Sequence, residues 1–150
     1  LAYIDLDDLH HMPGWQERPL DDFRRLLTEA LRAEKWAVAG NYTDRAQNIT
    51  WPAADTLIWL DMPFWSNFWQ LFKRTMTRAY SGEVICNGNT ENLFKQFFTK
   101  ESILWWFLKT WHKNRRKYNA VFANPQDYPH LRLIRLRSYQ QSREFLEKAD

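Results

Sequence analysis

The chain has 150 residues, of which 45% are hydrophobic and 26% are charged, and no Pro/Gly/Ser-rich stretch divides it. We therefore expect one compact domain spanning residues 1–150. The net charge is only +3, and the single cysteine, Cys86, excludes an intramolecular disulfide and has no second thiol nearby for zinc. No apolar run reaches the roughly 20 residues that cross a bilayer, so we expect no membrane segment and a reducing, cytoplasmic location.

Aromatic side chains are abundant, with nine tryptophans and ten phenylalanines. Rings of this size supply much of the apolar surface of a core. Several of them lie in segments that also carry lysine and arginine, which leaves stacking on a base or on a partner open. An aromatic-rich core is the simpler of the two interpretations.

Charge is distributed unevenly along the sequence. Residues 1–34 hold eight acids against four arginines, a net charge of −4, whereas residues 70–118 hold ten bases against three acids, a net charge of +7. We expect the middle of the chain to face anions.

The first third of the chain predicts a strand, a loop and a helix. Residues 1–6 alternate between apolar and polar side chains, and the acids Asp7 and Asp8 follow them. The Pro-Gly pair at 13–14 requires a loop. Apolar side chains recur at helical spacing over residues 19–33, which predicts a helix there.

The next segments predict two buried parallel strands and a second helix. The strands span residues 36–39 and 56–60, which are short apolar runs closed by turn residues. Residues 64–80 form the helix pattern. On it, Arg74 and Arg78 stand four positions apart, so both project from one face and could hold a phosphate group between them.

The last third predicts a long helix, a strand and a final helix. The long helix spans about residues 99–118, with Thr99 as its N-cap, a basic face and an apolar face. The apolar face contains Leu104, Phe107, Leu108 and Trp111, and the basic face contains Lys109, His112, Lys113, Arg116 and Lys117. Residues 132–136 alternate as a strand, and Ser138 caps the final helix. The complete order predicts a three-layer α/β/α domain with a mostly parallel sheet.

Polar side chains follow the predicted strands, at the edge where open α/β sheets bind their ligands. They are Asp7, Asp8, Gly40, Asn41, Tyr42, Asp61, Arg137 and Ser138. A carboxylate at such an edge can hold a hydroxyl group, act as a base or bind magnesium through water. The alternative for Asp7 or Asp8 is that it only begins a turn.

Ordered short motifs at these positions resemble a known family. They are Leu6-Asp7 with the PGW of residues 13–15, the WAVAGNY of residues 36–42 and the WLDMP of residues 59–63. Together they resemble the bacterial topology modulation proteins, which are small P-loop proteins similar to adenylate and shikimate kinases. The resemblance continues through Trp69 to Thr75, Asn87 to Glu91 and Arg135 to Ser138, and so spans the whole chain.

The resemblance implies a P-loop kinase-like fold that lacks its first strand and P-loop helix, with a lid-like helical insertion at about residues 81–118. It also implies a nucleotide-dependent phosphotransferase, adenylate kinase-like, or an NTPase. The reaction would use ATP and Mg²⁺ with a nucleotide or a small-molecule phosphate acceptor. No G-x-x-x-x-G-K-[ST] loop is present, so we expect an N-terminally truncated fragment that is inactive as it stands.

The resemblance also assigns roles to individual residues. Arg74 and Arg78 would be catalytic and would face the transferring phosphate. The substrate-binding residues would be Asp7, Asp8, Trp15, Gly40, Asn41 and Tyr42. The cofactor-binding residues would be Lys113, Arg116, Arg137 and Ser138, and no residue is assigned to a metal. Three positions depart from the family pattern, namely Ala39, where many relatives carry an acid, and Phe64 and Gln70, where arginine is common.

Two other interpretations stay open. The basic, aromatic helix 104–118 could instead bind nucleic acid, with lysine and arginine on the phosphates and tryptophan against the bases. A truncated reading frame could also give a product that folds poorly, because an edge strand and its covering helix are missing. Metal binding by His10 and His11 is disfavoured, since adjacent residues cannot share one helix face and no third ligand is suitably spaced.

Overall fold

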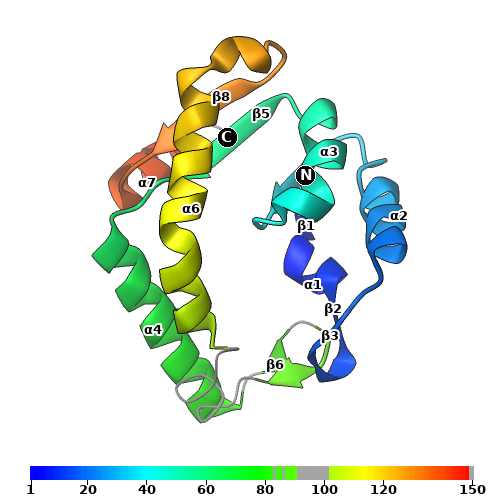
Figure 1. Cartoon of the computed structure of the whole chain (residues 1–150), viewed down its shortest axis with the longest axis vertical. Helices are drawn as coiled ribbons and strands as arrows, with labels where there is room; N and C mark the ends of the chain where they lie inside the picture. Colours follow the sequence, from blue (N-terminus) through cyan, green and yellow to red (C-terminus); the bar gives the residue numbers. More distant parts are fainter. Residues whose placement is uncertain (83, 86, 91–101, 149–150) are drawn as a thin grey trace. The chain divides into compact units, whose positions relative to one another are not determined.

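The structure is a computed structural model that describes residues 1–82, 84–85, 87–90 and 102–148 (Figure 1). They fall into two compact units, which we describe separately. Unit 1 consists of Leu1–Ala54 and Val84–Thr90, and unit 2 consists of Asp55–Glu83 and Glu91–Asp150. Within the described residues, the molecule mixes α-helices with short parallel and antiparallel sheets, so the α/β class is confirmed at this coarse level.

Unit 1 contains ten elements. They are β1 (Ala2–Asp5), α1 (Leu6–His10), β2 (His11–Met12), η1 (Pro13–Trp15), β3 (Gln16–Glu17), α2 (Leu20–Ala30), β4 (Trp36–Ala39), α3 (Thr43–Ala53), β6 (Val84–Ile85) and β7 (Asn89–Thr90). Strands β1 and β4 pair in parallel, which confirms the two predicted strands. The β2–β3 and β6–β7 pairs are antiparallel.

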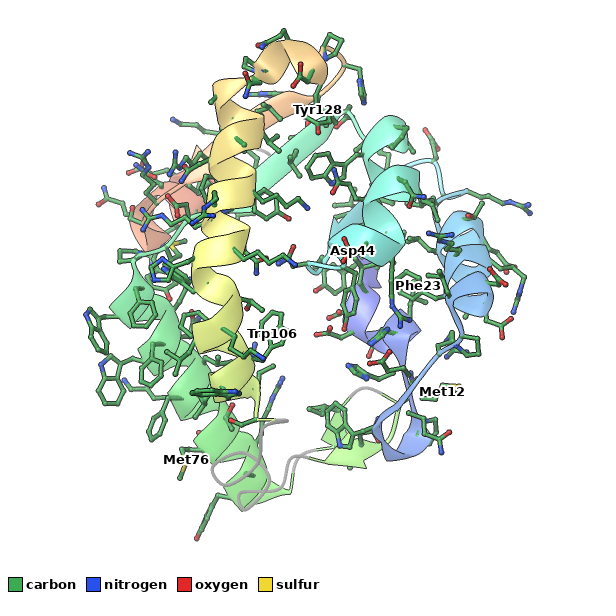
Figure 2. The ribbon with its side chains drawn as sticks, viewed as in Figure 1. Met12, Phe23, Asp44, Met76, Trp106 and Tyr128 are labelled. Atoms are coloured by element: carbon green, nitrogen blue, oxygen red, sulfur yellow. The ribbon has the colours of Figure 1, made fainter. Side chains whose placement is uncertain are left out.

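The core of unit 1 forms where α2 covers β1 and α1. Phe23 and Leu27 lie one helical turn apart on α2 and are fully buried against Ile4 and Leu6. Figure 2 shows Phe23 on the inner side of α2. The apolar spacing that predicted this helix therefore marks its buried face, although α2 ends at Ala30 and not at residue 33.

Two helices of unit 1 were missed by the sequence prediction. The short α1 follows β1 directly, where a strand end and a loop were expected. Helix α3 was missed because its apolar positions are sparse and Pro52 lies in its last turn. Its buried residues are small, Ala46 and Thr50, and such side chains give little hydrophobic periodicity.

The described residues of unit 2 form six further elements. They are β5 (Thr56–Leu60), α4 (Phe64–Ser81), α6 (Ile103–Ala123), η2 (Pro125–Asp127), β8 (Arg132–Leu136) and α7 (Tyr139–Glu147). Strands β5 and β8 pair in parallel with Thr56 opposite Arg132 and Leu60 opposite Leu136. Both strands have the predicted bounds, and Ser138 is the predicted N-cap of α7, accepting a hydrogen bond from the Gln141 N–H.

Helices α4 and α6 pack through aromatic rings, and Figure 1 shows the two side by side. Phe64, Phe68 and Phe72 recur every fourth residue on α4 and stack with centroid distances of 6.2 and 6.4 Å. Phe64 also contacts Phe107 and Trp111 of α6. These rings contribute to the packing of unit 2, but Trp65, Trp69, Trp105 and Trp106 are exposed, so only part of the aromatic content predicted for a core is buried.

The bounds of α6 differ from the prediction at its C-terminal end. The helix runs to Ala123, five residues past Tyr118, because no helix breaker precedes Asn124 and Pro125 and because Val121 is buried. At the other end, the Ser102 side chain caps the helix by accepting from the Trp105 N–H. The predicted N-cap, Thr99, and part of the predicted insertion at 81–118 lie outside the described residues.

The prediction that the strands are buried on both faces is wrong. Tyr3, Ile58 and Leu60 are exposed. The physical reason is that each parallel sheet has two strands, so the covering helices shield only part of its surface. Leu108, predicted on the apolar face of α6, is also exposed. Among the described residues, no helix combines the length and the apolar character needed to cross a membrane.

Candidate functional site

The ends of β1 and β4 bring predicted site residues of unit 1 together. Asp5 is opposite Ala39 in the parallel register, so the residues that follow each strand are neighbours. The Tyr42 hydroxyl donates a 2.6 Å hydrogen bond to Asp7 Oδ1. Asp8 and Asn41 are exposed beside them. The structure thus joins Asp7 to Tyr42, as expected for polar residues at one sheet edge.

Gly40 is required at this edge by its conformation and by its surroundings. Its φ angle is +130°, which side-chain-bearing residues rarely adopt. A Cβ atom at this position would lie 2.8 Å from the Leu6 Cβ. The glycine therefore allows the β4 end to approach α1 closely, which sets the position of Tyr42 next to Asp7.

Asp5 has a structural role at the same edge. Its carboxylate accepts a 2.9 Å hydrogen bond from the Asp7 N–H and caps α1. The two acids at this strand end therefore have different roles. Asp5 caps the helix, whereas the Asp7 side chain accepts the hydrogen bond from Tyr42.

Trp15 is held by a hairpin from a distant part of the sequence. Its backbone N–H donates to Asn89 Oδ1 at 2.9 Å, and Asn89 Nδ2 donates to the Met12 carbonyl at 3.0 Å. Asn87 Nδ2 lies 2.7 Å from the Asp8 carbonyl oxygen and 2.6 Å from that of His11. Asn87 and Asn89 were named from the sequence only within the segment that resembles the family, and the structure shows that their amides fix the loop that carries Trp15.

His10 is a buried titratable group behind this edge. Its ring packs 4.6 Å from Tyr42 and 6.2 Å from Phe23, and its Nδ1 is buried without a hydrogen-bond partner. Burial lowers the pKa of His10 below its ordinary value, helped by the charges of His11 and Arg45 and opposed by Glu17. The neutral ring is therefore the form that the folded unit favours.

This pKa shift predicts that unit 1 loses stability in mild acid. The folded state binds the His10 proton less readily than the unfolded chain, so the free energy of unfolding should fall as the pH drops below about 6.5, the ordinary histidine pKa. Urea unfolding at several pH values between about 8 and 5, followed by the intrinsic tryptophan fluorescence of the chain, measures this slope. His10→Gln removes the titrating ring and should flatten the slope in this range. An equal slope in the variant would assign it to other groups.

The proposed catalytic arginines of α4 do not lie in the charged cluster of unit 2 described below. Arg74 is exposed and Arg78 is half-buried one turn later on the same helix. On α6, the proposed cofactor residues Lys113 and Arg116 are both exposed. Ser138 uses its hydroxyl to cap α7, so its side chain already has a structural role.

Asp61 is the centre of a charged cluster at the carboxyl ends of β5 and β8. Its side chain is only 3% exposed, and its backbone N–H donates to the Leu136 carbonyl at 2.8 Å. Arg135 donates to Asp61 Oδ2 from Nη2 at 2.6 Å and from Nε at 3.0 Å. Arg115 approaches Oδ1 through Nε at 3.4 Å, and Arg137 approaches Oδ2 through Nε at 3.8 Å. We call these four residues the Asp61 cluster.

Aromatic packing positions the arginines of the Asp61 cluster. Arg135 is opposite Trp59 in the sheet register, and its guanidinium carbon lies 4.2 Å from the centroid of that indole. Trp59 in turn stacks on Tyr118 of α6 at 5.5 Å. Arg115 lies one turn before Tyr118 on the same helix, so this stacking brings it to Asp61. Burial in this contact raises the pKa of the Tyr118 phenol.

Sequence reasoning found part of this cluster. Asp61 and Arg137 were singled out because they follow strands, but Arg115 was omitted and Arg135 was noted only within a family motif. The alternation of β8 places Arg135 on the same face as Leu133, and the parallel register then places it beside Trp59. The strand register could therefore have identified Arg135 as a site residue. The helix pattern of α6 contains no feature that distinguishes Arg115 from its basic neighbours.

Two of the three positions that depart from the family pattern, Phe64 and Gln70, have defined contacts in unit 2. Phe64 packs against α6, as described above, and the Gln70 Oε1 accepts a 2.5 Å hydrogen bond from the Tyr139 hydroxyl. An arginine at either position would lose that contact. These residues therefore stabilise the packing of α4 in this chain.

The resemblance implies two cofactors, ATP and Mg²⁺, and the described residues can be compared with what each of them needs. Arginine guanidinium groups with two positive charges in excess suit the phosphate groups of ATP. Within residues 1–82, 84–85, 87–90 and 102–148, however, no group of three or more His, Cys, Asp or Glu side chains could hold a metal ion. Mg²⁺ at phosphoryl-transfer sites is held by one or two carboxylates together with water and substrate phosphates, so it would not require a group of that size.

Known proteins give no further guide to the site, since neither a family model, nor a curated protein, nor a solved structure matches this chain.

Proposed function

We propose that this chain binds the phosphate groups of a nucleotide and serves nucleotide-dependent phosphoryl transfer, either to an acceptor or to water. The observation that carries the proposal is the convergence of three arginines on the single buried carboxylate of Asp61. The resemblance to P-loop kinases of the adenylate kinase type supports the same chemistry. In this proposal the α/β units belong to a three-layer kinase-like fold.

Electrostatics favours an anion at the Asp61 cluster. One carboxylate compensates one of three guanidinium charges, and each guanidinium has five N–H donors. Arg115 and Arg137 are 48% and 62% exposed, so a ligand can reach them from solvent. A phosphate group accepts paired hydrogen bonds from arginine and supplies the missing negative charge. The cluster also lies at the strand ends where α/β sheets bind ligands.

The remaining predicted site residues complete the proposal. Arg74, Arg78, Lys113 and Arg116 would assist in holding phosphate. In unit 1, the hydrogen-bonded pair of Asp7 and Tyr42 is taken by itself as a substrate-binding pair, as the resemblance implies, because a carboxylate can orient or deprotonate a hydroxyl group. ATP would donate the phosphate, and no step of this proposal is assigned to Mg²⁺.

The test is nucleotide binding by the chain and by variants of its exposed cluster arginines. Arg137→Ala should weaken ATP binding about tenfold, because it removes a charge-assisted hydrogen bond. Arg115→Ala should act similarly, and ATP binding by both variants can be followed by calorimetry.

The matched control is Arg132→Ala. This arginine is exposed at the opposite end of β8, beside the Asp55 carbonyl, and its loss should leave ATP binding unchanged. Tripolyphosphate separates phosphate recognition from nucleotide recognition, because equal affinity for both ligands would limit the cluster to phosphate. Unchanged ATP binding in Arg115→Ala and Arg137→Ala would make the Asp61 cluster a structural ion network and refute the proposal.

A further inference from the structure

A groove lies between α4 and α7 in unit 2, and its lining includes none of the four residues of the Asp61 cluster. It encloses about 530 Å³ and is lined by Trp65, Ser66, Trp69, Gln70, Lys73 and Tyr139. Neither indole belongs to the buried core, since Trp65 is 66% exposed and Trp69 is 53% exposed. Two large rings are thus presented to solvent on one wall of a groove whose other wall carries a tyrosine.

The two indoles are held in place by neighbouring rings. Trp65 contacts Phe68 edge-to-face at 6.0 Å, and Trp69 contacts Phe72 in the same way at 5.6 Å. Those phenylalanines belong to the aromatic stack that packs α4 against α6. The exposed rings are therefore mounted on a packed helix face, so little side-chain entropy is lost when a flat ligand stacks on them.

Their spacing suits successive units of a polymer. Trp65, Trp69 and Lys73 follow one another at intervals of four residues, so they form a stripe along α4. Each interval advances about 6 Å along the helix axis, which is close to the reach of one nucleotide in an extended single strand. Two adjacent bases can stack on the two indoles while the ammonium group of Lys73 meets the next phosphate.

Polar groups in the groove suit base edges. The Tyr139 hydroxyl donates to Gln70 Oε1. This hydrogen bond orients the Gln70 amide, whose Nε2 group is a hydrogen-bond donor. The Ser66 hydroxyl lies in the same groove. These groups can hydrogen-bond a base without selecting one base strictly, as is usual where stacking supplies most of the affinity.

The charge of unit 2 favours a polyanion. Its described residues contain thirteen lysines and arginines against five aspartates and glutamates, whereas those of unit 1 contain six against nine. This excess disfavours a second copy of unit 2 as the occupant, because the two basic surfaces would repel each other. A neutral carbohydrate would stack on the indoles but would gain nothing from Lys73 and Arg74.

From these features we infer that the α4–α7 groove binds single-stranded nucleic acid, with successive bases on Trp65 and Trp69 and phosphate at Lys73. The inference does not depend on the proposed phosphoryl transfer. It places the contact on α4, not on the basic helix 104–118, which the sequence left open as an alternative nucleic-acid-binding element.

The test is fluorescence anisotropy with labelled single strands of about 12 nucleotides, one of oligo-dT and one of oligo-U. The unsubstituted chain should bind with an affinity that falls steeply between about 50 and 200 mM salt. Trp65→Ala and Trp69→Ala should each weaken binding at least about fivefold, and Trp69→Phe should restore most of the loss. Lys73→Gln should reduce the salt slope by about one. A preference between the two strands identifies DNA or RNA as the natural ligand class.

The matched control is Trp106→Ala. Trp106 is 48% exposed in the same unit and projects from α6 on the side away from α4 (Figure 2), so binding should be unchanged. Three results would overturn the inference: no loss in Trp65→Ala and Trp69→Ala with circular dichroism unchanged, an equal loss in Trp106→Ala, or a duplex bound as tightly as the single strand. An equal loss in Trp106→Ala would assign the binding site to α6. Equal affinity for duplex and single strand would show that charge alone accounts for binding.

Discussion

Asp61→Ala is expected to lower the free energy of unfolding of unit 2 by about 3 kcal/mol, because it leaves the guanidinium groups at the strand ends without their buried counter-charge. Arg135 loses the most interaction, since it makes two hydrogen bonds to this carboxylate and its side chain is only 22% exposed. Arg115 and Arg137 extend into solvent and contribute less. Amide hydrogen exchange of β5 and β8 measures the loss within unit 2.

Two further variants separate charge from packing at Asp61. Asp61→Asn preserves the size of the side chain and one acceptor, so its loss should be smaller than that of alanine. Asp127→Ala replaces an exposed aspartate of η2 in the same unit and should stay within about 0.5 kcal/mol of the unsubstituted chain. Equal protection of β5 and β8 in Asp61→Ala and Asp127→Ala would show that the three ion pairs contribute nothing to stability.

Phe23→Ala is expected to destabilise unit 1 by about 3 to 5 kcal/mol, the range for deleting a buried phenyl ring. Phe23 is 0% exposed and lies in a core whose other buried members are Ile4, Leu6, Leu27 and Ala46. A unit of about 60 residues has little stability to spare. Most of unit 1 should therefore unfold in the variant, which loss of exchange protection at β1 and β4 would report.

A graded series on α2 tests the explanation for Phe23. Phe23→Leu keeps much of the buried volume and should cost less than alanine. Leu20→Ala, at an exposed position of the same helix, should cost less than either. A loss in Leu20→Ala as large as that in Phe23→Ala would contradict core packing as the cause, because alanine is the better helix former at both positions and only Phe23 is fully buried.

The two proposals use different surfaces of unit 2. Phosphate binding relies on exposed arginines at the strand ends, and nucleic-acid binding relies on exposed indoles of α4. The effect of Arg137→Ala on ATP binding and the effect of Trp69→Ala on single-strand binding are therefore independent tests of the two proposals. A variant that loses ATP binding but still binds single strands would separate the two activities.

Local sequence patterns determined about half of the described elements of this protein, chiefly the longer ones. The strands at 36–39, 56–60 and 132–136 and the cap at Ser138 follow from short-range chemistry, and the structure confirms them. Helix α3 could not be predicted in this way, because a helix that buries alanine and threonine depends on what packs over it.

The sequence by itself determined that Asp7, Asp8, Asp61 and Arg137 stand at strand ends, since alternation and turn residues mark where each strand stops. Only the tertiary structure decided which partners these side chains meet. Asp7 meets Tyr42 because Gly40 permits a close approach to Leu6. Asp61 gathers arginines from α6 and β8 because Trp59 aligns both elements. Such contacts join residues far apart along the chain, so they depend on register and packing, which no local spacing encodes.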